Sequence, residues 1–262
     1  MKRHNNMEEL SKVIDLSLKA GQLMLSSNCE IYRAEEVMRN ICYTYGYKDI
    51  NIFTLATCIY LSVDDKDQTI TKIKRIYHRS TNATRISNIN QLSRDIKEQH
   101  LDIETCKQRL DEIQNEKGYS DIKRAFTMSL SCAVFGKMFV PTATIMAFLI
   151  TFLITFLCYY LMKWLNRYEL NAFILNTLLA MIMTFFAVMS VRVGFAHDID
   201  TIVIGTIMIL VPGVAFTNAV RDLMNGDVLS GTIRTVEGLI IALGIAFGVG
   251  VTLYFSNVGG LL

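Results

Sequence analysis

Residues 211–231 read VPGVAFTNAVRDLMNGDVLSG, and this stretch decides how the second half of the chain is interpreted. An apolar segment is interrupted at Pro212 and Gly213, and polar residues follow the interruption. Unsatisfied backbone groups and charges cost several kcal/mol in hydrocarbon, so a broken helix of this kind usually borders a cavity or a helix contact. The pattern indicates transport, without naming a cargo.

The composition changes abruptly near residue 124. Residues 1–124 hold 20 of the 26 Lys and Arg residues and 18 of the 24 Asp and Glu residues. We therefore predict a cytoplasmic α+β domain at residues 1–124 and a transmembrane domain at residues 125–262. The expected fold class is a mostly α, polytopic α-helical membrane protein, whose small amino-terminal domain combines helices with a β-hairpin.

Local patterns predict the elements of the amino-terminal domain. Apolar residues at helical spacing indicate four amphipathic helices, and a stretch rich in β-branched and aromatic residues indicates a hairpin. Asp102 is a candidate helix cap. The first expected helix ends near residue 28, and the other three cover residues 30–45, 84–97 and 103–115. The expected strands cover residues 49–63 and 69–77.

Five apolar segments follow residue 124, and most reach the roughly 20 residues needed to cross a bilayer. The expected spans are residues 125–139, 140–165, 172–191, 199–219 and 232–255. Lys and Arg accumulate in the loops on one side of these spans, which predicts a plasma-membrane protein with a cytoplasmic amino-terminal domain. The basic residues on that side are Lys123, Arg124, Lys163, Arg167, Arg221 and Arg234, against Lys137 and Arg192 on the other side.

A polar stripe follows the interruption in the fourth expected span. Asn218, Arg221 and Asp222 fall on one face of a helix, together with Asn225. Arg221 suits a carboxylate and Asp222 suits an ammonium group or a proton, so the stripe is a candidate substrate-binding or gating site with Pro212 and Gly213 as its hinge. The alternative is an Arg221/Asp222 pair that anchors a helix end at the membrane surface.

The fifth expected span carries one carboxylate and a Gly-x-x-x-Gly pattern. Glu237 is a candidate proton-coupling residue, although it could instead form an ion pair with Arg234. Gly244 and Gly248 are expected to allow close helix packing, because small residues let two backbones approach each other.

Two further polar positions belong to other expected spans. Asn176 lies on a small, polar face of the third span, where it could contact cargo or make an interhelical hydrogen bond. Asp200 follows His197 and Asp198 before the fourth span, and it is a second candidate for proton coupling at the external end. A solvated helix amino terminus explains the same acidic residues.

Several classes of function lack their residues in this sequence. There is no Gly-x-Ser-x-Gly, His-Glu-x-x-His or P-loop pattern, so we expect neither an enzyme nor an ATP-driven pump. The six cysteines form no Cys-x-x-Cys pair, and we expect no metal, cofactor or disulfide framework. A net charge of +2 without a basic arm disfavours nucleic acid.

Three stretches together resemble the threonine/serine exporter family. They are residues 20–25, residues 29–41 (CEIYRAEEVMRNI) and residues 198–238, which contain the Pro-Gly, Thr-Asn, Arg-Asp, Gly-Asp and Ser-Gly pairs in succession. The chain departs from the family at Asn28, where glycine is frequent, and at Lys137. The resemblance implies a cytoplasmic domain followed by about five spans.

The resemblance also implies a partner, because many relatives carry a second multi-span half. We expect the lipid bilayer, a small polar metabolite and a second small multi-span membrane protein or a homo-oligomer as partners. The expected function is a proton-coupled secondary exporter subunit for threonine and serine or for a short dicarboxylate such as succinate. The alternative is a membrane-anchored sensor or assembly subunit without a transport path of its own.

Overall fold

The computed structural model describes residues 2–65, 68–116, 118–140 and 144–258. It divides into two compact units. Unit 1 comprises Met1–Lys117 and Val214–Val236, and unit 2 comprises Gly118–Gly213 and Glu237–Leu262. The polar stripe therefore belongs to the same unit as the amino-terminal domain.

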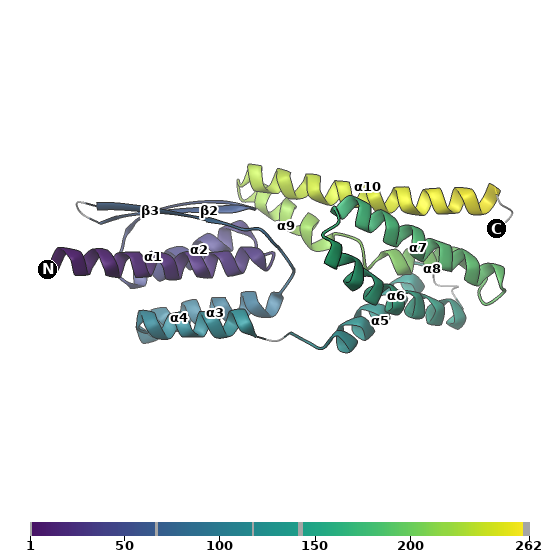
Figure 1. Ribbon diagram of the computed structural model, residues 1–262, viewed down its shortest axis with the longest axis horizontal. Helices are drawn as coiled ribbons and strands as arrows, with labels where there is room; N and C mark the ends of the chain where they lie inside the picture. The colour runs from purple at the N-terminus through teal and green to yellow at the C-terminus, as the bar shows by residue number, and fades with distance from the viewer. Residues whose placement is uncertain (1, 66–67, 117, 141–143, 259–262) are drawn as a thin grey trace. The chain divides into compact units, whose positions relative to one another are not determined.

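Unit 1 has three layers (Figure 1). The outer layers are a three-stranded sheet and the helix pair α3 (Ala83–Gln99) and α4 (Ile103–Asn115). The middle layer consists of α1 (Lys2–Ser26) and α2 (Ile31–Thr44). All four helices lie where the apolar periodicity predicts them, and the side chain of Asp102 caps α4 by accepting a hydrogen bond from the Thr105 amide.

The sheet is antiparallel in the order β1 (Asp49–Leu55), β2 (Cys58–Asp65) and β3 (Gln68–Arg75). The expectation of one strand over residues 49–63 is wrong, because the chain reverses at Ala56 and Thr57. These residues are not typical of tight turns, and the alternating pattern continues on both sides of them, so periodicity alone does not reveal the reversal. The hairpin expected around residues 64–67 is present as β2 and β3.

Unit 2 is helical. It contains α5 (Asp121–Phe139), α6 (Ile145–Leu165), the 3-10 turn η1 (Asn166–Tyr168), α7 (Ala172–Arg192), α8 (Ile199–Ile207) and the larger part of α10 (Val228–Val258). Three helical segments are long and apolar enough to cross a membrane: Ile145–Tyr168, Ala172–Arg192 and Val228–Asn257. The division into five spans stays a prediction.

The interruption predicted at Pro212 and Gly213 is present. The fourth expected span contains two helices, because α8 ends at Ile207 and α9 (Gly213–Met224) begins directly after Pro212. Proline lacks a backbone N–H and fits only the start of a helix, which explains why α9 begins at this point. The chain passes from unit 2 to unit 1 at the same position.

Helices α5 and α8 approach each other through two glycines. A Cβ atom on Gly136 would lie 2.7 Å from the Thr201 carbonyl oxygen of α8, and one on Gly205 would lie 3.0 Å from the Cys132 carbonyl oxygen of α5. The space between these helices therefore admits only hydrogen at either position.

Candidate functional site

The candidate site begins at the turn between α1 and α2. Asn28 has a φ of +61°, in the left-handed region that glycine adopts readily. The turn leaves three backbone groups pointing away from both helices: the carbonyl oxygens of Asn28 and Cys29 and the N–H of Ile31. All three are bonded by side chains from the distant segment Val214–Val236.

The three bonds come from the polar stripe and from the start of α10. Asn218 Nδ2 donates to the Asn28 carbonyl at 2.7 Å, and Arg234 Nη2 donates to the Cys29 carbonyl at 2.9 Å. The Ile31 N–H donates to Asp222 Oδ1 at 3.2 Å. Within unit 1, hydrogen bonds thus join the turn at residues 28–31 to a segment about 190 positions later in the sequence.

Asp222 acts as a long-range cap of α2. Ile31 is the first residue of that helix, and its N–H has no partner within the helix. A carboxylate at this position satisfies the N–H and also interacts favourably with the positive end of the helix dipole. The Asp222 residue is 0% exposed, so the cap lies inside the unit.

Ion pairs formed by two carboxylates, Asp222 and Glu30, surround this cap. Asp222 Oδ2 lies 3.2 Å from Nη1 of Arg234, whose side chain is only 4% exposed. Glu30, which is also buried, pairs with Arg221 and lies 3.3 Å from Arg33 Nη1. The Arg221 side chain is 55% exposed. The Asp222–Arg234 pair is therefore fully buried, whereas the Glu30–Arg221 pair is open to solvent at its arginine.

The environment shifts the pKa values of these carboxyl groups in opposite directions. Burial by itself would raise the pKa of Glu30, but hydrogen bonds from its own N–H and from Arg221, with the charge of Arg33, lower it overall. Burial raises the pKa of Asp222, against the charge of Arg234 and the Ile31 N–H. Burial likewise raises the pKa of Asp227, in the turn between α9 and α10.

Some predicted site residues lie together and others do not. Asn218, Arg221 and Asp222 all contact residues 28–31, but Arg221 and Asp222 have separate partners, Glu30 and Arg234. Asn176 belongs to unit 2, where its amide donates to the Ala172 carbonyl of its own helix at 2.7 Å. Asp200 lies in the first turn of α8 and Glu237 is half-buried on α10, both in unit 2.

The two packing glycines lie against α7. A Cβ atom on Gly244 would lie 2.9 Å from the Phe173 carbonyl oxygen, and one on Gly248 would lie 2.5 Å from the Thr177 carbonyl oxygen. Thr177 Oγ1 also donates to the Gly244 carbonyl at 3.1 Å. Backbone contact and a side-chain hydrogen bond therefore join α7 and α10.

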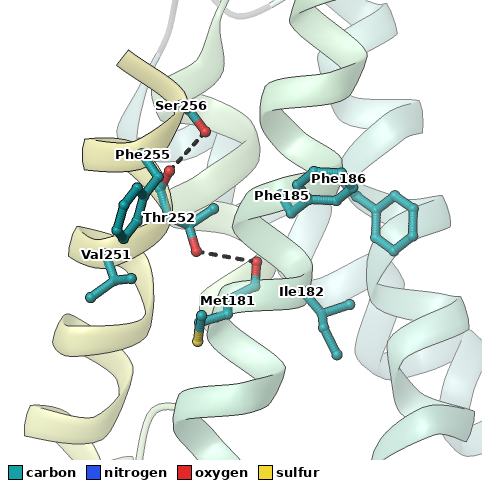
Figure 2. Close-up of a pocket in the computed structure, with 8 residues that line it drawn as sticks. All are labelled: Met181, Ile182, Phe185, Phe186, Val251, Thr252, Phe255 and Ser256. Carbon is teal, nitrogen blue, oxygen red and sulfur yellow. Dashed lines mark hydrogen bonds between the residues drawn. The ribbon is translucent and has the colours of Figure 1, made fainter. Parts of the chain in front are cut away.

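Figure 2 shows a pocket of about 520 Å³ beyond these glycines, between α7 and α10. Three phenylalanines and three aliphatic side chains line most of its wall. The Thr252 hydroxyl donates to the Met181 carbonyl at 3.5 Å and to the Gly248 carbonyl at 2.9 Å, and the Ser256 hydroxyl donates to the Thr252 carbonyl at 2.7 Å. Such a lining offers no charged group to a polar metabolite and suits apolar chains instead.

The sequence interpretation missed the amino-terminal half of the site. The sequence interpretation assigned no role to Cys29 or Glu30, which are 0% and 5% exposed in the structure. Arg234 was considered as a basic residue of the cytoplasmic side and as a partner of Glu237, not as a partner of Asp222 or of the Cys29 carbonyl. One signal was present in the sequence. The stretches at residues 29–41 and 198–238, which carry the family resemblance, both contain acidic and basic residues that could pair with each other.

Within the described ranges, no three His, Cys, Asp or Glu side chains cluster as metal ligands would. The six cysteines are free, and five of them are buried.

Replacing Asn28 tests the left-handed turn. Asn28→Gly should change the free energy of unfolding by less than about 0.5 kcal/mol, since glycine adopts this conformation without strain. Asn28→Val should cost about 1–2 kcal/mol, because a β-branched side chain is strained there. Melting of the purified chain in detergent measures both, and equal melting temperatures would contradict the assignment.

The opposite pKa shifts predict opposite effects of two Glu→Gln changes. Glu30 has a lowered pKa, so its charge stabilises the fold above the unfolded value of 4.5 and this stabilisation disappears as the pH falls through the folded pKa. Glu35 has a raised pKa, mainly from burial and also from the charge of Asp227, so its charge destabilises the fold at pH 7.

Glu30→Gln should therefore lower stability at pH 7 by about 1 kcal/mol, with a smaller effect near pH 4. Glu35→Gln should raise stability at pH 7 and have little effect near pH 4. Melting temperatures of both variants between pH 4 and pH 8 measure the difference, and a shift of the same sign for both at pH 7 would refute it.

Comparison with known proteins gives the family. The family model described as "Putative threonine/serine exporter" matches residues 15–256. A protein of Mycobacterium tuberculosis (strain ATCC 25618 / H37Rv) named "Probable threonine/serine exporter" is 21% identical over 244 residues, which are 92% of this chain and 46% of that protein. This chain thus spans about half the length of that curated relative. No solved structure matches.

The matched region includes both halves of the candidate site, from the turn at Asn28 to Arg234 at the start of α10. It also covers the helical segments that are long and apolar enough to cross a membrane, two of them completely and the third up to residue 256. The chain is a membrane protein and belongs to the threonine/serine exporter family.

Proposed function

We propose that this chain takes part in the export of threonine and serine across the plasma membrane, with unit 1 on the cytoplasmic side. The observation that carries this proposal is the family match over residues 15–256, which covers both units. Three helical segments able to cross a membrane support it.

Arg221 is the proposed point of contact with cargo. Its side chain is half-exposed and its partner Glu30 is a carboxylate, the same group that an amino acid presents. The carboxylate of the cargo would compete with Glu30 for the guanidinium of Arg221 and so break the Glu30–Arg221 ion pair. Asp222 and Arg234 are fully buried, so they hold the turn at residues 28–31 in place.

Proton coupling is proposed for Glu237, with Asp200 as a second candidate at the opposite end of the pathway. Both are carboxyl groups of unit 2, and Glu237 lies within a helical segment long enough to cross the membrane. A carboxyl group in that setting can take up and release a proton as its exposure changes. Pro212 and Gly213 would provide the hinge for this change.

A partner is proposed to supply the remaining part of the transport path. The relative is about twice as long as the match, so a second multi-span protein or further copies of this chain would complete the assembly. If two proteins form the exporter, a short dicarboxylate such as succinate is the alternative cargo that we propose.

Flux in proteoliposomes tests these proposals. Vesicles containing the chain, with and without the candidate partner, are loaded with labelled threonine, serine or succinate, and efflux is followed with and without a proton gradient. Arg221→Ala should reduce efflux about tenfold or more, since a charge-assisted hydrogen bond is lost. Glu237→Gln should abolish the effect of the gradient.

Glu169→Gln, the same change at an exposed position of unit 2, is the matched control and should leave efflux unchanged. Absence of efflux with every cargo and partner, or unchanged efflux in both variants, would favour a membrane-anchored sensor or assembly subunit instead.

A further inference from the structure

A polar cleft lies within unit 1, lined by residues of α1, β3 and the end of α4. Its volume is about 470 Å³, which is within the range of small-molecule sites. One wall is a single face of α1, where Asp15, Leu18, Lys19 and Gln22 follow each other at helical spacing. Leu18 is 3% exposed and contributes an apolar patch to this wall.

The opposite wall is the edge strand β3. Lys72 and Lys74 alternate with Ile73, so both lysines extend from the same face of the strand. Lys72 is held in place, because its Nζ lies 2.7 Å from Asp15 Oδ1 and 2.7 Å from Ser11 Oγ. The two walls are therefore joined at one end of the cleft by a fixed ion pair.

Other polar groups in the cleft remain available. In the part of the chain that the structure describes, the side chains of Gln22, Lys74 and Gln114 have no hydrogen-bond partner, and Asp15 uses only Oδ1. Lys19 pairs with Asp111 on α4, which supports the same rim. The cleft thus offers one ammonium group, one carboxylate oxygen and two amides to a ligand.

The positions of these groups select a ligand class. Lys74 is two residues beyond Lys72, so its backbone is about 6.6 Å along the strand from the position paired with Asp15. A small molecule placed in this interval meets a positive group at one end and a negative group at the other. A simple cation would be repelled by Lys74, and a simple anion would leave Asp15 Oδ2 without a donor.

We propose that this cleft binds a free amino acid, with the α-carboxylate at Lys74, the ammonium group at Asp15 and a polar side chain at Gln22 and Gln114. Every residue that lines this cleft belongs to unit 1, and we assign it to sensing of the amino-acid concentration and not to the transport path. Export is the proposed function of the chain, but binding in this cleft can be tested without it.

Lysine acetylation of the full chain, read by mass spectrometry, tests the cleft directly. L-threonine or L-serine should slow acetylation of Lys74 severalfold and leave Lys97, an exposed lysine on α3, unchanged. Malonate and ethanolamine, which carry only one sign of charge, should protect Lys74 less. Gln22→Ala should raise the threonine concentration needed for protection, whereas Gln99→Ala, at an exposed position, should not.

Three outcomes would overturn the proposal: no protection of Lys74 by either amino acid, equal protection of Lys74 and Lys97, or protection by malonate alone. These three outcomes are measured on the unaltered protein, so they do not depend on whether the Gln22→Ala variant folds. Loss of flux in proteoliposomes with retained protection would refute the proposed export and leave this site intact.

Discussion

Arg234→Met should destabilise unit 1 by about 3–5 kcal/mol, the cost of leaving one member of a buried ion pair without its partner. The change removes the guanidinium 3.2 Å from Asp222 Oδ2 and the donor to the Cys29 carbonyl. Asp222 would remain charged inside the unit, and the first turn of α2 would loosen. Hydrogen–deuterium exchange of the amides in residues 31–44 measures this loss locally, together with the melting temperature.

Two further variants show whether charge is the cause. Arg33→Met removes an arginine that is 36% exposed and leaves Glu30 with Arg221, so the cost should stay below about 1 kcal/mol. Adding Asp222→Asn to Arg234→Met should recover part of the loss, since no charge stays buried and the amide oxygen can still accept from Ile31. If the amides of residues 31–44 exchange hydrogen for deuterium at the same rate in Arg33→Met and Arg234→Met, the buried pair does not stabilise the turn.

Gly248→Ala should weaken the packing of α10 against α7, whereas Gly250→Ala should not. A Cβ at residue 248 would lie 2.5 Å from the Thr177 carbonyl oxygen and 2.9 Å from Ala180 Cβ, so the helices must separate, at a cost of about 1–3 kcal/mol. A Cβ at residue 250 meets nothing within 4 Å, and alanine there should stabilise the helix by about 0.5–1 kcal/mol.

The two variants change the same residue type two positions apart in one helix, which makes each the control of the other. Thermal stability in detergent measures the global effect, and hydrogen–deuterium exchange of α7 places it. A similar shift of both variants would show that this glycine contact does not hold the two helices together.

Local order could be predicted from the sequence because it depends on neighbouring residues. The periodicity of α2 and α4, the cap at Asp102 and the interruption at Pro212 are each decided within a few positions. The reversal at Ala56 escaped prediction because the two strands share one alternating pattern. Local reasoning is therefore strongest where a turn or cap has its own residue signal.

The candidate site could be predicted only in part. Asn218, Arg221 and Asp222 stand out as polar residues after an apolar helix, but their partners at residues 28–31 lie about 190 positions away. Two of those partners are backbone groups, the Asn28 carbonyl and the Ile31 N–H, which leave no trace in the identity of the residue. The third, Glu30, has the composition of an ordinary surface charge, and only tertiary structure shows that it is buried.

The distance in sequence between Ile31 and the carboxylate that caps it affects how the protein is made. The two residues are 191 positions apart, so at about 5–20 residues per second a ribosome needs about 10–40 s to reach Asp222 after Ile31. During that interval α2 lacks its cap, and Glu30 lacks its ion pair with Arg221. The first domain to be synthesised is thus completed among the last, and a nascent chain that stalls before Asp222 would carry an unfinished domain open to proteolysis.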